Sequence, residues 1–136
     1  MTDKELCTLA IKAMSNSYSP YSDYRVGAAL LTEAGKVYTG CNIENSAFSP
    51  TCCAERTAFF KAVSEGERSF LKIAIAGGKN GEALNETICP CGVCRQVMAE
   101  FCKPDFKILL VKSENEYTET TLAELLPLAF SGDNIK

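Results

Sequence analysis

The chain has 136 residues, a length typical of one domain, so we expect a single domain over residues 1–136. Hydrophobic residues make up 46% of it and charged residues 23%, which is the composition of a globular protein with a core. The net charge of −3 disfavours binding to a nucleic-acid backbone. No apolar run reaches the roughly 18 residues of a membrane span, and residues 1–5 do not resemble a signal peptide, so we expect a cytoplasmic protein.

The first predicted elements are a helix and an antiparallel hairpin. Thr2 and Glu5 have the spacing of a capping box, and apolar residues then recur at helical spacing. The turn-rich segment 15–22 ends this helix. A nearly continuous apolar stretch over residues 24–32, followed by a turn and a return strand from Val37, predicts the hairpin.

Helices and strands alternate in the rest of the chain. In order, we predict a helix over residues 54–63, a buried strand over 72–77, a helix over 91–101, a strand over 106–112, a strand near Tyr117 and a short helix capped by Thr121 and Glu124. This order predicts one sheet with helices on both faces, and the hairpin makes that sheet mixed.

The chain has eight cysteines and no histidine, so a transition-metal site must use thiolates. Cys91 and Cys94 have the C-x-x-C spacing common in zinc sites, and Cys53 can supply a third ligand. All three lie at predicted helix N-termini, where free N–H groups and the helix dipole favour a thiolate. The five remaining cysteines are expected to be small buried hydrophobic residues: Cys7, Cys41, Cys52, Cys89 and Cys102. Cys52 and Cys89 are also alternative zinc ligands, because each lies close to a proposed ligand in the sequence.

Three protein ligands leave the fourth position of a zinc ion open for water, which is the arrangement of a catalytic site. Glu55 lies two residues after Cys53 and is free to transfer protons. Three thiolates outweigh the charge of one Zn²⁺, so Arg56 and Arg95, each beside a ligand, are candidates to hydrogen-bond the sulfur atoms. A structural zinc module used for binding is the alternative from another class, and it would need a fourth ligand.

Three motifs together resemble the small cytidine deaminases that have a three-cysteine zinc site. They are Gly40–Asn45 (GCNIEN), Cys53–Ala58 (CAERTA) and Pro90–Gln96 (PCGVCRQ). The similarity extends from about Leu6 to Phe130. It implies a three-layer α/β/α sandwich with a five-stranded mixed sheet, one zinc ion per subunit, and a homotetramer with its sites at subunit interfaces. It also implies hydrolytic deamination of cytidine and deoxycytidine to uridine and deoxyuridine, a reaction of pyrimidine salvage.

The resemblance further implies roles for single residues. Glu55 would move a proton to N3 of the pyrimidine and to the leaving amine while zinc-activated hydroxide attacks C4. Asn42 and Glu44 would bind the ribose hydroxyls, although by themselves polar residues at a strand end are also typical of a loop cap. Phe130 would reach the pocket of a neighbouring subunit. The expected substrate-binding residues are Tyr24, Asn42, Ile43, Glu44, Asn45, Ser46, Ala47, Phe48, Ala54 and Phe130.

Two positions depart from the family pattern, since Tyr24 stands where members more often have Phe and Phe48 where many have Tyr. The nearest alternative function is deamination of another small substrate, such as a nucleoside antibiotic of the blasticidin type. Asn42 and Glu44 favour a ribose and therefore the nucleoside. A polynucleotide-editing deaminase is disfavoured by the acidic charge and the small size of the chain.

Overall fold

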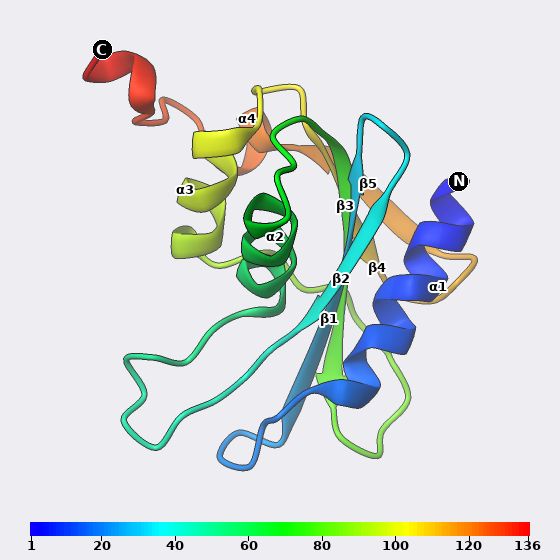
Figure 1. Ribbon diagram of the computed structural model, residues 1–136. Helices are drawn as coiled ribbons and strands as arrows, with labels where there is room; N and C mark the ends of the chain where they lie inside the picture. The colour runs from blue at the N-terminus through cyan, green and yellow to red at the C-terminus, as the bar shows by residue number, and fades with distance from the viewer.

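Five strands form a single mixed sheet in the computed structural model, which describes residues 1–136 (Figure 1). The strands are β1 (Tyr24–Thr32), β2 (Val37–Cys41), β3 (Phe70–Lys79), β4 (Lys107–Val111) and β5 (Tyr117–Thr121). Their order across the sheet is β2-β1-β3-β4-β5. β3 and β4 are parallel and the other neighbouring pairs are antiparallel. The predicted hairpin and the predicted mixed sheet are both confirmed.

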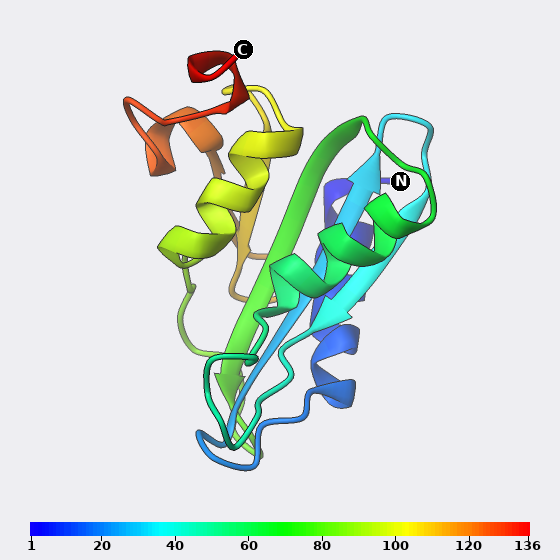
Figure 2. The same ribbon diagram turned by 60° about the vertical axis from the view of Figure 1, so that its left-hand side comes forward.

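Helices cover both faces of this sheet, so the predicted three-layer α/β/α sandwich is also confirmed (Figures 1 and 2). The helices are α1 (Asp3–Ala13), α2 (Ala54–Ser64), α3 (Gly92–Phe101) and α4 (Leu122–Leu125), with 3₁₀ turns η1 (Met14–Asn16) and η2 (Gly132–Asn134). α1 packs on one face, and α2, α3 and α4 pack on the other. None of the helices has both the length and the apolar character that crossing a membrane requires.

The apolar run of β1 follows from its position inside the sandwich. Ala28 and Leu30 belong to the core under α2, whereas Ala29 and Leu31 belong to the core under α1. Successive side chains of a strand point to opposite faces, so a strand covered on both faces must be apolar at nearly every position.

Two glycines bring helices unusually close to the sheet. A Cβ atom on Gly27 would lie 2.1 Å from the carbonyl oxygen of Ala10 in α1. A Cβ atom on Gly40 would lie 2.5 Å from the carbonyl oxygen of Ala54 and 2.6 Å from the nitrogen of Ala58 in α2. Only a glycine permits these backbone approaches. Gly40 therefore sets the position of the first turn of α2.

The third strand is longer than the predicted 72–77. It runs over Phe70–Lys79 because it pairs with β1 along nearly the whole length of that strand, from Tyr24 opposite Lys79 to Thr32 opposite Phe70. The residues added at the two ends are Phe70 and Leu71 on one side and Gly78 and Lys79 on the other. They belong to the strand because their backbones pair with β1, and hydrophobic periodicity does not report such pairing.

Candidate active site

The site begins where α2 and α3 begin, at the same end of the sheet (Figures 1 and 2). Cys53 is the N-cap of α2, Cys91 is the N-cap of α3, and Cys94 lies in the first turn of α3. The three Sγ atoms all lie within 4.8 Å of one another, and those of Cys53 and Cys91 are 3.7 Å apart. Sulfur ligands about 2.3 Å from a tetrahedral zinc ion lie roughly 3.8 Å from each other. The cluster therefore has the dimensions of a zinc site.

The cluster contains the three predicted cysteines and neither of the alternatives. The sulfur of Cys52 instead accepts a hydrogen bond from Thr57 Oγ1 at 3.7 Å. Cys89 is exposed, and all eight cysteines are free thiols. The structure therefore brings together the three cysteines that were expected to be ligands.

Positive charge beside the cluster comes from Arg56, whose Nη2 lies 3.5 Å from Cys53 Sγ. Hydrogen bonding from the Cys94 thiol, and then from Arg56, lowers the pKa of Cys53 to about 5. The same contact with Cys53 raises the pKa of Arg56, so both groups stay charged. A thiolate is the form that binds a metal ion.

Arg95 does not occupy the place expected for it beside the sulfur atoms. Its Nε donates to the carbonyl oxygen of Pro90 and its Nη1 to that of Leu125, both at 2.7 Å. The guanidinium group thus connects the chain before α3 to the end of α4. Arg95 therefore contacts the backbone beside the turn with Cys91 and Cys94, and Arg56 is the arginine that contacts a sulfur atom.

Glu55 supplies a buried carboxyl group in the first turn of α2. Its side chain is only 3% exposed, and Oε1 has no hydrogen-bond partner. Burial raises its pKa to about 7. A buried polar atom without a partner is costly. Its presence beside three cysteines fits a site in which a metal ion, a water molecule or a substrate completes the bonding.

The segment of Asn42, Ile43 and Glu44 lies directly against the chain that leads to the first zinc ligand. Ile43 and Cys52 form an isolated antiparallel bridge, with both N–H···O bonds at 2.9 Å. Ile43 also bridges to Tyr18. The two predicted motifs, 11 residues apart between Asn42 and Cys53, are therefore held together by the backbone itself.

The side chain of Asn42 is bonded mainly within the protein. Its Oδ1 accepts from the Val26 N–H at 2.9 Å and from the Ser17 hydroxyl, and its Nδ2 donates to the Tyr24 carbonyl at 2.8 Å. An amide NH₂ has two protons. One of them has no partner within the chain and is available to a ligand.

The Glu44 carboxylate is bonded to the loop before β1. Oε1 accepts from the N–H groups of Tyr21 at 2.9 Å and Ser22 at 3.1 Å, and Oε2 accepts from the Ser22 hydroxyl. The Ser22 hydrogen bond lowers the pKa of Glu44, so the group is ionised at neutral pH. Ser17 and Ser22 were missed at the sequence level because the turn-rich segment that contains them reads as a plain loop.

The loop after Glu44 has a defined shape. Asn45 Oδ1 accepts from the Ala47 N–H at 2.9 Å, across Ser46. Phe48 is 68% exposed and contacts the Tyr21 ring edge-on at 5.9 Å between centroids. Its φ of +60° is in the left-handed region.

Three predicted residues lie in different surroundings. Tyr24 is half-buried at the start of β1, and Ala54 is fully buried against Gly40. Phe130 is 58% exposed, and its carbonyl oxygen accepts from Gln96 of α3 at 2.8 Å. The single chain does not bring the Phe130 side chain into the cysteine cluster.

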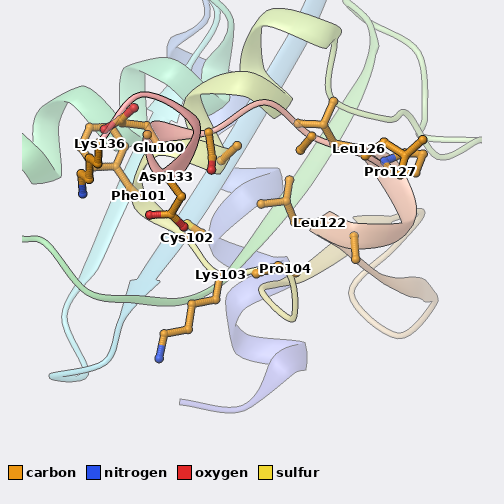
Figure 3. Close-up of a pocket in the computed structure, with 16 residues that line it drawn as sticks. Glu100, Phe101, Cys102, Lys103, Pro104, Leu122, Leu126, Pro127, Asp133 and Lys136 are labelled. Atoms are coloured by element: carbon orange, nitrogen blue, oxygen red, sulfur yellow. The ribbon is translucent and has the colours of Figure 1, made fainter.

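A cavity of about 500 Å³ lies elsewhere, between α3, α4 and the C-terminal segment. Figure 3 shows Phe101, Leu122 and Leu126 among the residues that line it. Its one cysteine, Cys102, has a pKa raised to about 12 by burial and stays a neutral thiol. The cysteine cluster lies at the N-terminal end of α3, and this cavity lies at the C-terminal end of that helix.

Residues 1–110 match the family model described as the cytidine and deoxycytidylate deaminase zinc-binding region. This match, together with the three-cysteine cluster, identifies the chain as a zinc-dependent deaminase that holds one zinc ion. A cytidine deaminase from Sporosarcina psychrophila is 50% identical over 135 residues, covering 99% of this chain and 96% of that protein. One from Halalkalibacterium halodurans is 46% identical over 126 residues, covering 93% and 92%.

The fold leads to the same relatives. The crystal structure of cytidine deaminase from Burkholderia pseudomallei superposes with a TM-score of 0.86 at 43% identity, and the match covers 96% of this chain and all of that one. The chain belongs to the cytidine deaminase family.

Proposed function

We propose that this chain, acting as a single cytidine deaminase domain, hydrolyses cytidine and deoxycytidine to uridine and deoxyuridine with release of ammonia. The observation that carries the proposal is the buried, unpartnered oxygen of Glu55 beside the sulfur atoms of Cys53, Cys91 and Cys94. When bound by these sulfurs, zinc supplies Lewis acidity and makes water a strong nucleophile at neutral pH.

Glu55 moves the protons of the reaction. It accepts a proton from the attacking water and donates it to N3 of the base as the oxygen adds to C4. It then transfers the second proton to the amine, and the bond between C4 and that amine breaks. A carboxyl group fixed in the first turn of a helix and removed from solvent is suited to this repeated transfer.

Arg56 keeps the thiolate cluster from becoming too rich in electrons. Its guanidinium group shares the charge of Cys53 through the 3.5 Å contact. Arg95, through the carbonyls of Pro90 and Leu125, keeps the turn with Cys91 and Cys94 in place.

Asn42 and Glu44 bind the sugar. Within the protein each side chain retains one unused position, an N–H proton on Asn42 and an acceptor position on Glu44 Oε2. A donor and an acceptor together match a hydroxyl group, which accepts one hydrogen bond and donates another. Tyr24 flanks the base, and the loop of residues 45–48 with Ala54 completes the pocket.

The active assembly is a homotetramer with sites at subunit interfaces, in which Phe130 enters the pocket of a neighbour. The exposure of large apolar side chains near the C-terminus supports this, since Leu128 is fully exposed and Phe130 and Ile135 are 58% and 77% exposed. Exposed apolar side chains that gather in one region mark interaction surfaces.

The test is to measure zinc content and deamination on the purified chain. We expect about one zinc ion per chain and loss of the ultraviolet absorbance of cytidine and deoxycytidine. Free cytosine, which has no sugar, should be a very poor substrate because the polar groups of Asn42 and Glu44 are then left unpaired. A zinc-loaded protein that leaves both nucleosides unchanged would disprove the proposal.

A further inference from the structure

The hydroxyl group of Ser22 joins two of the proposed substrate-binding residues. It donates to Oε2 of Glu44 and accepts from the backbone N–H of Tyr24 at 3.1 Å. The Ser22 N–H donates to the other carboxylate oxygen of Glu44 at 3.1 Å. One small residue in the loop before β1 therefore contacts both oxygens of the carboxylate.

These bonds leave the carboxylate with little freedom. A carboxylate offers about four acceptor positions. The N–H groups of Tyr21 and Ser22 fill the two on Oε1, and the Ser22 hydroxyl fills one of the two on Oε2. One acceptor position remains. Since Tyr24 N–H already donates to Ser22 Oγ, the single hydroxyl proton is directed to Glu44.

The loop that presents Ser22 is itself held rigidly. Asp23 has a φ of +57°, its N–H donates to the Ser19 carbonyl at 3.0 Å, and its own carbonyl accepts from Asn80 at 2.9 Å. The Tyr24 carbonyl accepts from Asn42 at 2.8 Å. The backbone of Tyr24 is thus connected to Asn42 on one side and, through Ser22, to Glu44 on the other.

We infer that Ser22 is a positioning residue for sugar recognition. It holds the Glu44 carboxylate in one orientation and determines that a single acceptor position is offered to a substrate hydroxyl. The inference rests on the proposed function, because it takes Glu44 to be a sugar contact. Hydrogen bonds to a charged group are stronger and shorter than neutral ones, and loss of the hydroxyl leaves only the two backbone bonds on Oε1 to orient the carboxylate.

The test compares Ser22→Ala and Ser22→Thr on deoxycytidine and on 2′,3′-dideoxycytidine, which lacks the sugar 3′ hydroxyl. We expect Ser22→Ala to raise KM for deoxycytidine about tenfold with kcat changed less than about twofold, from the strength of a charged hydrogen bond. The values for dideoxycytidine should stay the same. Ser22→Thr keeps the hydroxyl and should restore KM to within about threefold. Ser22 is exposed, so neither change disturbs the core.

A Glu44→Ala background completes the experiment. If Ser22 acts through Glu44, Ser22→Ala has no further effect on deoxycytidine in that background. Equal losses on deoxycytidine and dideoxycytidine, or equal losses with and without Glu44, would mean that Ser22 only maintains the loop, and would overturn the inference alone. Inactivity of the zinc-loaded wild type on both cytidine and deoxycytidine would overturn the proposed function, and the inference with it.

Discussion

At the scale of single residues, the chemistry depends on placing a carboxyl group that lacks a partner beside sulfur atoms that carry charge. Glu55 is one of only a few polar residues in the buried set, and it follows Cys53 by two positions at the start of α2. The first turn of a helix presents N-cap and N2 side chains near the same free N–H groups. A short stretch of sequence thus supplies both a cysteine of the cluster and the proposed proton carrier.

Glu55→Gln should abolish turnover while keeping the zinc ion. Glutamine preserves the size of the side chain but cannot carry the proton, so kcat should fall by at least about 10²–10⁴-fold. The measurement is kcat on cytidine together with zinc content by atomic absorption. Glu65→Gln, an exposed change at the other end of α2, is the matched control and should leave both unchanged. Near-normal turnover of Glu55→Gln would contradict the assigned role.

Arg56→Gln should move the pH profile of kcat to higher pH. The guanidinium group shares the negative charge of the Cys53 thiolate through the 3.5 Å contact. Without it, the sulfur atoms would donate more charge to a zinc ion that they hold, which would make that ion a weaker Lewis acid, so the rising limb of the profile shifts to higher pH. The measurement is kcat from about pH 5 to 9 with zinc content checked at each point. Arg68→Gln is the control, because Arg68 is exposed and donates only to backbone carbonyls. An unchanged profile would make Arg56 a purely structural cation.

At the scale of elements, the position of the site depends on how closely α2 approaches the sheet. β2 reaches α2 at Gly40, where the backbone of Ala54 lies against it. α3 is held by other means, since Arg95 connects its start to α4. The two helix starts that carry the cysteines are therefore fixed by separate contacts.

Gly40→Ala adds only one methyl group but should reduce activity strongly. Its Cβ would lie 2.5 Å from the carbonyl oxygen of Ala54, so the first turn of α2 must shift and carry Cys53 and Glu55 with it. We expect at least a tenfold loss of kcat/KM and about 1–3 kcal/mol lower stability, typical of overpacking. Activity and urea denaturation measure the two effects. Gly132→Ala should change neither, because its Cβ would meet nothing closer than 3.7 Å.

At the scale of the whole molecule, one chain presents an apolar C-terminal region that the fold does not cover. The backbone carbonyl of Phe130 accepts a hydrogen bond from Gln96 of α3, while the phenyl ring remains exposed. The sheet and its helices bury 32 residues without using this region. The proposed homotetramer would place a second subunit over this surface.

Phe130→Ala should therefore weaken substrate binding without unfolding the chain. If the ring enters a neighbouring pocket, we expect KM for cytidine to rise at least about tenfold, because hydrophobic burial of an aromatic side chain contributes about 1.5–3 kcal/mol. Light scattering should give four chains per particle for the wild type. Leu71→Ala, an exposed apolar residue of β3 outside the C-terminal region, is the control and should keep KM unchanged. A monomeric, fully active wild type would disprove the subunit-contact proposal.

Much of the fold could be predicted from the sequence because its signals are local. The apolar run of β1, the cap of α1 at Thr2 and the helix after Cys53 each depend on residues close together in the chain. The C-x-x-C spacing of Cys91 and Cys94 likewise indicates a metal site without knowledge of the fold. What the sequence determined by itself is the set of elements, the family resemblance and the zinc-binding residues.

The tertiary structure alone decided how distant residues meet. The bond between Ser22 and Glu44 spans 22 positions, and that between Arg95 and Leu125 spans 30. The approach of Gly40 to Ala54 also requires β2 and α2 to be packed. A polar side chain in a loop has many possible hydrogen-bond partners of the same chemical type along the chain. Only the packed tertiary structure determines which of them lies within reach. For this reason Arg95 donates to backbone carbonyl oxygens, whereas the sequence predicted that it would bond to the sulfur atoms. For the same reason Ser22 is bonded to Glu44, the residue that the family resemblance assigned to the sugar.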